Sequence, residues 1–402
     1  MKKFLAVLLF FTAFLFSGCV PPEYYLRHLP ENPDSPIVVA AFLPLTGSNR
    51  NYAEQMREGL LAAETRINQN RGIGGRRMKL QIIDTAGTAE GTAEALKKAE
   101  TMGAVAAIAG YSTGEVSMLI KHASELQMPM VIPMATSDEH LQVSPFVYRN
   151  CFSDLQQMEM LASYLFFWRK LRRGAIITDA ADHDYTRGIS RNFTQAVRDL
   201  NGEISVNIVV AKDTELSDDQ VIKLLTADPD FVLVSSGGKR AADMIRKLRE
   251  SRFRGIICGP DSWDDGALTD ALRDVEVGDC IFTAFFNPEN DNREAVRFQK
   301  EFRKRFYNNP GACETQSFDA LIFLAIGLEK AEHLYDFDRN WRKIVNFPGA
   351  AAYYTMGRKG ELDRTIYLKS FGVDRGGESL RIYPRLSRKL QYSKLKDYRV
   401  IE

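Results

Sequence analysis

Histidine, cysteine and excess charge are all scarce in this 402-residue sequence, and each scarcity excludes a class of function. The five histidines and five cysteines include no H-E-x-x-H or C-x-x-C spacing, so the metalloprotease and zinc-site templates lack their residues. The formal net charge is only +1 and no long basic run occurs, which argues against a nucleic-acid partner. We therefore expect no catalytic residues, no metal and no cofactor.

The N-terminal segment has the composition of a secretory signal followed by a tether. Two lysines precede an apolar run over 4–16, which is shorter than the ~20 residues that span a bilayer, and Ser17-Gly18-Cys19 closes it. The segment resembles the lipobox of bacterial lipoproteins, which implies a signal peptide over 1–18, lipidation of Cys19 and a tether over 19–36. An uncleaved anchor helix is the alternative. In both cases the folded part is expected in the cell envelope, attached to a membrane on its periplasmic or extracellular side.

Four further cysteines stand in the remainder of the chain. An envelope location permits disulfides, and three pairings of four cysteines are possible, so the sequence leaves the pairing open. These cysteines are Cys151, Cys258, Cys280 and Cys313.

From residue 37 onward, short β-branched apolar runs alternate with longer amphipathic ones, which is typical of parallel βαβ units. One series of units ends near Tyr148-Arg149-Asn150, and a second series follows. The sequence therefore predicts an α/β fold with two three-layer halves in tandem. The predicted strands are 37–45, 78–84, 105–109, 130–133, 174–178, 204–210, 231–235 and 256–258. The predicted helices are 52–70, 91–102, 114–126, 155–171, 186–200, 218–225 and 240–250.

The C-terminal third departs from two halves in simple succession. Further helices are predicted over 292–306 and 317–331, and an alternating pattern predicts a strand over 362–372 after a glycine-bounded turn at 357–360. We infer that the chain crosses between the two lobes more than once.

Loops at the carboxyl ends of the strands hold the best candidate binding residues, because ligands of open α/β sheets bind there. In the first half, Thr113 and Thr136 lie in such loops before predicted helices, where hydroxyl and N–H donors suit a carboxylate. In the second half, Asp261 suits a ligand ammonium, while Tyr185 offers a hydroxyl and Trp263 an aromatic wall. Helix capping and ordinary core packing are the alternative interpretations.

Five short motifs occur in order along these loops and helices. They are Ala40-Ala41-Phe42-Leu43-Pro44-Leu45-Thr46-Gly47, Gly72-Ile73-Gly74-Gly75, Ile108-Ala109-Gly110-Tyr111-Ser112-Thr113, Pro133-Met134-Ala135-Thr136-Ser137 and Ser317-Phe318-Asp319-Ala320. Together they resemble the branched-chain amino acid binding proteins, which are type I periplasmic binding proteins of ABC transporters. The resemblance covers nearly all of residues 37–372.

This resemblance implies two Rossmann-like three-layer α/β/α lobes joined by a three-strand hinge. The first lobe is expected to comprise 37–150 and 285–345, and the second 151–284 and 346–402. The hinge is expected to close the lobes on a ligand.

The resemblance also implies a ligand site between the lobes. Thr113, Thr136 and the backbone of Met134 would hold a carboxylate, and Asp261 would neutralise an α-ammonium from the opposite lobe. The full predicted set is Tyr52, Ser112, Thr113, Met134, Ala135, Thr136, Tyr185, Asp261 and Trp263. The departures from the family pattern are Gly237 in place of an aromatic residue, Asp261 in place of glutamate, and Met134 in place of alanine. Glu314 is expected to face the cleft.

We therefore expect a monomeric, lipid-anchored protein that captures an amino acid or related small carboxylate and delivers it to an ABC permease. One alternative is an enzyme, for which His183 between two aspartates is the most catalytic-looking position. The other is a sensor or regulator of a cell-envelope enzyme on the same scaffold, which ligand-dependent stabilisation would distinguish.

Overall fold

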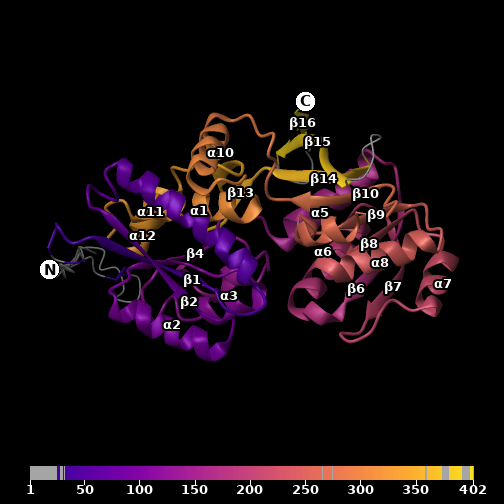
Figure 1. The fold of residues 1–402 in the computed structure, drawn as a ribbon, viewed down its shortest axis with the longest axis horizontal. Helices are drawn as coiled ribbons and strands as arrows, with labels where there is room; N and C mark the ends of the chain where they lie inside the picture. Colours follow the sequence, from indigo (N-terminus) through magenta and orange to yellow (C-terminus); the bar gives the residue numbers. More distant parts are fainter. Residues whose placement is uncertain are drawn as a thin grey trace, which may run out of the picture.

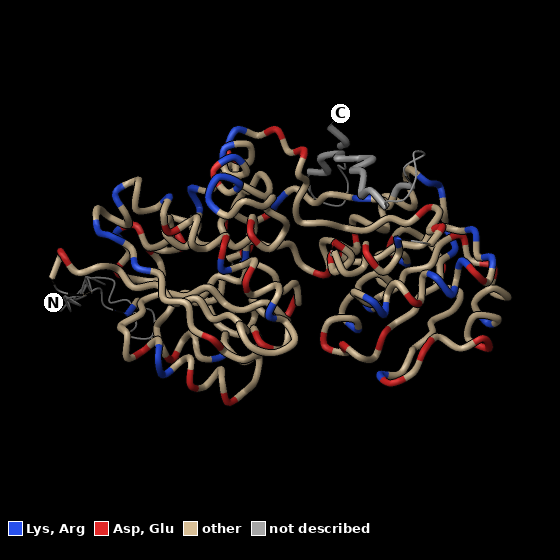
Figure 2. Tube along the Cα trace, viewed as in Figure 1, with Lys and Arg blue, Asp and Glu red and all other residues tan. Residues whose placement is uncertain are grey.

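The computed structural model describes residues 25–27, 30, 32–264, 266–273, 275–357, 360–373, 380–391 and 399–401. The predicted signal peptide and Cys19 lie outside the described residues. Figure 1 shows two lobes side by side, each with helices around a central sheet. Charged residues follow the outer elements, whereas the inner strands of the first lobe carry few (Figure 2).

The first lobe is built on a five-stranded parallel sheet in the order β2-β1-β3-β4-β5. Four of the strands, β1, β3, β4 and β5, are almost wholly buried, which matches their apolar sequence, whereas the edge strand β2 is only partly buried. The strands are β1 (Ile37–Leu43), β2 (Met78–Asp84), β3 (Ala106–Ile108), β4 (Met130–Ile132) and β5 (Val147–Arg149). The helices between them are α1 (Arg50–Gln69), α2 (Ala89–Thr101), α3 (Thr113–Ile120) and α4 (His140–Val143).

The second lobe contains an eight-stranded mixed sheet in the order β16-β15-β14-β10-β9-β8-β6-β7. The strands β6 to β10 pair in parallel, and β14 to β16 extend the sheet in antiparallel fashion. The strands are β6 (Arg173–Asp179), β7 (Glu203–Val210), β8 (Phe231–Ser235), β9 (Ile256–Gly259), β10 (Cys280–Ala284), β14 (Ile366–Val373), β15 (Leu380–Gln391) and β16 (Arg399–Ile401). The helices are α5 (Asp154–Phe167), α6 (His183–Asp199), α7 (Asp218–Thr226), α8 (Gly238–Glu250) and α9 (Gly266–Ala271).

Between β10 and β14 the chain returns to the first lobe. There it forms α10 (Arg293–Phe306), α11 (Ala312–Leu328) and α12 (Leu334–Trp341), followed by a small sheet of β11 (Phe347–Pro348), β12 (Tyr353–Met356) and β13 (Leu362–Arg364). Helix α11 packs against α1, β3 and β4, and this burial on most sides explains its nearly continuous apolar sequence.

The three crossings between lobes meet around one arginine. The ring of Phe152, just before α5, stacks on that of Phe285, just after β10, with centroids 4.2 Å apart. Arg364, at the end of β13, is buried beside both rings and donates to the carbonyl of Phe285. A hinge of three chain crossings was expected, and the guanidinium that joins them was not.

The segment predicted as one strand over 362–372 divides at Thr365. Residues 362–364 form β13, which pairs with β12. Ile366 begins β14, and this strand pairs with β10 of the second lobe. The expected lobe boundary at 345/346 is therefore too early. Strand β12 packs by Tyr354 on Phe323 of α11, and Glu361 bridges to Arg149 of β5, so residues 347–364 belong with the first lobe.

Part of the expected tether is docked on the first lobe. Leu26 is buried and its N–H donates to the carbonyl of Glu332, while Arg27 donates to the carbonyl of Gln127. Tyr25 lies against the ring of His333. The burial of Leu26 and the ring contact of Tyr25 explain why residues 25–27 pack as part of the domain.

Candidate functional site

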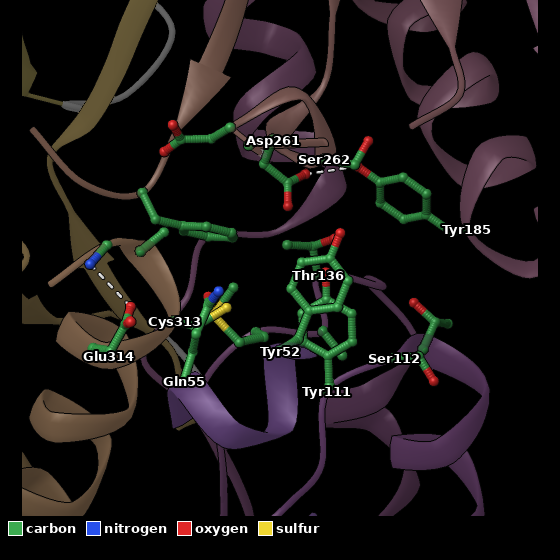
Figure 3. A pocket seen from close by; sticks show the side chains of 18 of the residues that line it. Tyr52, Gln55, Tyr111, Ser112, Thr136, Tyr185, Asp261, Ser262, Cys313 and Glu314 are labelled. Carbon is green, nitrogen blue, oxygen red and sulfur yellow. Dashed lines mark hydrogen bonds between the residues drawn. The ribbon is translucent and has the colours of Figure 1, made fainter. Parts of the chain in front are cut away.

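A cavity of about 340 Å³ lies between the lobes, at the carboxyl ends of the strands of both sheets. The first lobe contributes the N-termini of α1, α3 and α11 and the loop after β4, and the second lobe contributes the loops after β6 and β9 (Figure 3). All predicted site residues except Trp263 line this cavity, together with Glu314. The other lining residues are Gln55, Tyr111, Asp182, Ser262, Asp264, Gly266, Phe285, Asn309, Gly311, Ala312 and Cys313.

Two tyrosines form one wall of the cavity. Tyr52 lies in the first turn of α1, and Tyr111 follows β3. Their rings stack with centroids 4.4 Å apart and planes 4° from parallel. Tyr52 was predicted from sequence, whereas Tyr111 was not, although it directly precedes the predicted Ser112. The pair presents aromatic surface to a ligand (Figure 3).

The N-terminus of α3 already holds a carboxylate of the protein. Ser112 caps the helix by accepting from the N–H of Glu115, and Glu115 is buried with its own carboxylate accepting from the Tyr111 N–H at 3.0 Å. Burial raises the pKa of Glu115 despite this bond and a second one from Thr85. Fewer donors are therefore left for a ligand carboxylate than the sequence predicted.

The loop over 110–114 also spells the G-x-S-x-G pattern of serine hydrolases. Ser112 acts there as the N-cap of α3, and no histidine lines the cavity. The serine thus lacks the base that nucleophilic catalysis requires. His183, the other catalytic-looking position, lies outside this cavity, with both its side chain and that of Asp184 mostly exposed.

Thr136 is tied to a carboxylate that sequence analysis missed. Its hydroxyl bonds the side chain of Asp154, and its carbonyl accepts from the Asp154 N–H at 2.9 Å. Asp154, the first residue of α5, is buried, and this burial together with the nearby charges of Asp138 and Asp261 raises its pKa to about 7. The site therefore contains an additional acid next to the predicted carboxylate anchor.

Asp261 is held by neutral donors only. Its Oδ1 accepts from the hydroxyl of Tyr185 and from the amide of Gln157, each at 2.7 Å, and its own N–H donates to Gln157 at 3.1 Å. Thr283 of β10 fixes Gln157 in turn. Burial raises the pKa of Asp261 to about 6. A ligand cation at this carboxylate would supply the charge partner that the protein does not.

Trp263 does not line the cavity, contrary to prediction. It is fully buried, its indole N–H donates to the carbonyl of Ser236 at 2.9 Å, and it packs on Phe282 and Phe371. The indole faces the interior of the second lobe because Gly259 leaves space for it: a Cβ there would meet the ring at 2.0 Å. Asp264 takes its place at the cavity and pairs with Lys369 at 2.6 Å.

The described residues answer three further questions. The four cysteines that the structure describes are buried, and none of them forms a disulfide within the described residues. Within the described ranges, no group of three or more histidines, cysteines and acids is arranged to hold a metal ion. None of the described helices has the length and apolar character of a membrane span.

Two lobes of parallel α/β structure, three crossings and a cavity between the lobes define a two-lobed binding protein of the type I periplasmic binding protein fold. The chain belongs to the periplasmic binding protein family, whose match covers residues 36–341. This is a family of solute-binding proteins and not of enzymes, so the enzyme alternative is excluded. Its members work outside the cytoplasm, which agrees with the expected location.

Curated relatives and solved structures agree with this assignment. The Leu/Ile/Val-binding protein BraC3 of Rhizobium johnstonii is 28% identical over 337 residues, covering 81% of this chain and 89% of that protein. Leu/Ile/Val-binding protein homolog 3 of Brucella melitensis is 26% identical over 225 residues, which is 56% of this chain and 60% of that protein. The fold matches the substrate-binding protein LivJ of Streptococcus pneumoniae, solved with isoleucine, with a TM-score of 0.72 at 17% identity, covering 87% of this chain and 100% of that one.

Proposed function

We propose that the protein captures a small amine-bearing solute, an amino acid or a related small carboxylate, in the cavity between its lobes and delivers it to an ABC permease. The observation that carries the proposal is Asp261, a half-buried carboxylate that faces a cavity bounded by both lobes and, within the described part of the chain, accepts hydrogen bonds from neutral donors. A ligand ammonium is the partner this arrangement lacks. The names of the relatives, which bind leucine, isoleucine and valine, support the same class of solute.

Closure of the lobes follows from the same geometry. Lobe 1 offers the tyrosine pair and the loop at Thr136, while lobe 2 offers Asp261, so a bound solute contacts both. Asp138 of the first lobe accepts from the amide of Asn192 on α6 at 2.6 Å, which adds a direct contact between lobes. A solute with more contacts in the closed form shifts the population toward it, and no covalent step is involved.

The same proposal places the protein on the periplasmic or extracellular side of the cell envelope, anchored by lipid at Cys19. The N-terminal sequence supports this anchor, because the apolar run ends at Cys19. Metabolic labelling with a fatty acid tests it: the wild type should incorporate label in the membrane fraction, and Cys19→Ser should not. Equal labelling of both proteins would contradict lipidation at Cys19.

The binding site is tested by calorimetric titration of the purified, ligand-free protein with amino acids. For a solute that binds, Asp261→Ala is expected to cost about 2–5 kcal/mol of affinity, because it leaves the ammonium buried without a partner. The matched control is Asp228→Asn, on an exposed turn of the second lobe with a positive φ that asparagine tolerates. Unchanged affinity in Asp261→Ala would remove this residue from the site, and a regulator that binds no solute would show no heat.

A further inference from the structure

The cavity is lined by carboxylates and by no basic side chain. The acids are Asp182, Asp261, Asp264 and Glu314, and the described residues of the lining include no lysine, arginine or histidine. Among the described residues, Asp264 alone of these acids forms an ion pair, with the ammonium of Lys369 at 2.6 Å. The charge that lines the cavity is therefore strongly negative before a ligand enters.

The other acids are stabilised by neutral groups or lie near further acids. Glu314, at the N-terminus of α11, accepts from the Gly311 N–H at 2.9 Å and forms no ion pair within the described ranges. Burial and the nearby Glu58 raise its pKa. Burial likewise raises the pKa of Asp182, with Asp184 adding to the effect. A cation in the cavity would relieve these unfavourable charges.

One of the groups predicted to hold a ligand carboxylate, the hydroxyl of Thr136, already bonds a carboxylate of the protein, that of Asp154. The N–H of Tyr111, in the loop that precedes α3, likewise donates to the carboxylate of Glu115. A ligand carboxylate at this edge would lie near two buried acids, which like-charge repulsion disfavours. The first-lobe wall also contains the stacked rings of Tyr52 and Tyr111, and aromatic faces attract cations.

Asp261 and Glu314 stand apart around the cavity and belong to different lobes. Figure 3 shows Asp261 beside Tyr185 and Glu314 on the far side next to Gln55 and Cys313. A solute with one amine at each carboxylate would bridge the lobes and favour their closure.

We infer that the solute carries more positive than negative charge, as a dibasic amino acid or a diamine does, with one amine at Asp261 and the other at Glu314. This inference rests on the proposed function and narrows its solute class. It distinguishes this cavity from one that receives a zwitterion with an apolar side chain.

Calorimetric titration at low ionic strength compares lysine, ornithine and putrescine with leucine and glutamate. The tightest cationic probe is expected to bind at least about tenfold more tightly than leucine, and glutamate most weakly. Glu314→Gln should lower the preference for that cation over leucine by about tenfold. Glutamine retains the capping bond of a helix N-terminus, so the helix should form, which a thermal melt checks. Asp182→Asn, at another acid of the cavity lining, should lower the preference in the same direction, and Asp228→Asn, at an exposed acid outside the lining, should leave it unchanged.

Leucine binding as tightly as every cationic probe would overturn the inference, yet it would leave the proposed function intact provided that Asp261→Ala abolishes that binding. A cationic preference that survives in both Glu314→Gln and Asp182→Asn would also overturn the assignment of the second amine. Failure of every probe to bind ligand-free wild-type protein would overturn the inference and the proposed function together.

Discussion

Replacement of Asp261 by asparagine is expected to stabilise the ligand-free protein while it weakens ligand binding. Burial raises the pKa of Asp261 from an ordinary 3.8 to about 6, so the native state holds this carboxylate charged at a cost at neutral pH. A pKa raised from 3.8 to about 6 corresponds to about 3 kcal/mol of free energy at neutral pH. Asparagine keeps an oxygen for the bonds from Tyr185 and Gln157 but still buries an amide, so we expect a gain of about 1–3 kcal/mol at pH 7.

The direction of the pH dependence follows from the raised pKa. Between about pH 4 and pH 6 the native state binds this proton more tightly than the unfolded chain does, so the free energy of unfolding falls as pH rises. The asparagine variant has no carboxyl group at position 261 that can take up this proton. Its advantage in unfolding free energy over the wild type should therefore grow from pH 4 to pH 6 and then level off. Loss of the Asp261 charge also lowers the pKa of Asp154, which acts in the same direction.

Urea unfolding of the ligand-free wild type, Asp261→Asn and Asp228→Asn across this pH range measures the effect. Asp228→Asn changes an exposed acid and should follow the wild type at each pH. The reasoning is refuted if Asp261→Asn is less stable than the wild type at pH 7, or if the difference between them does not vary with pH. Either result would mean that Asp261 is stabilised as a carboxylate by groups other than its neutral partners.

Three further substitutions or modifications test the packing around the cavity. Lys369→Met should lower the free energy of unfolding by about 3–5 kcal/mol at pH 7, since it leaves Asp264 charged without its buried partner; urea unfolding measures this, and a loss below about 1 kcal/mol would contradict it. Gly59→Ala should destabilise the protein by about 1–3 kcal/mol or more, because its Cβ would meet the backbone oxygen of residue 314 at 2.1 Å. The control is Gly266→Ala, whose Cβ would meet nothing within 4 Å. Equal melting temperatures of the two variants would contradict the prediction. Cys313 lines the cavity with 5% of its surface exposed, so a bound solute should slow its reaction with a small alkylating reagent, as followed by mass spectrometry, and an unchanged rate would place the solute elsewhere.

Most of the fold could be predicted because each buried parallel strand is a short apolar run, whereas in each helix the apolar residues recur about every 3.6 positions. The division at Thr365 could not, since no glycine, proline or asparagine marks a turn between β13 and β14. What separates the two strands is the burial of Arg364 among aromatic rings from distant parts of the chain. The short strands β5 and β10 were missed for a similar reason, because they are defined by their partners more than by their length.

The candidate site divides in the same way. Residues in loops directly after strands, such as Thr136 and Asp261, could be predicted because parallel strands end at one edge of a sheet. Asp154 and Gln157 could not, since they lie on α5, and nothing local shows that this helix passes beneath Asp261. Trp263 was wrongly predicted to line the cavity. It stands two positions after Asp261 in a short helical turn, and residues two apart in such a turn face different sides.

The central claim is that the cavity between the lobes recognises the amine of a solute. The most direct test starts from protein purified free of ligand and measures its unfolding free energy after one of two compounds is added. One compound is an amino acid or diamine that binds, and the other is the matching compound that lacks the amine at the Asp261 end. At one hundred times the dissociation constant the amine-bearing compound should stabilise the protein by ~2.7 kcal/mol, and its deaminated counterpart at the same concentration should have little effect. Equal stabilisation by both compounds, or stabilisation that persists in Asp261→Ala, would contradict the claim.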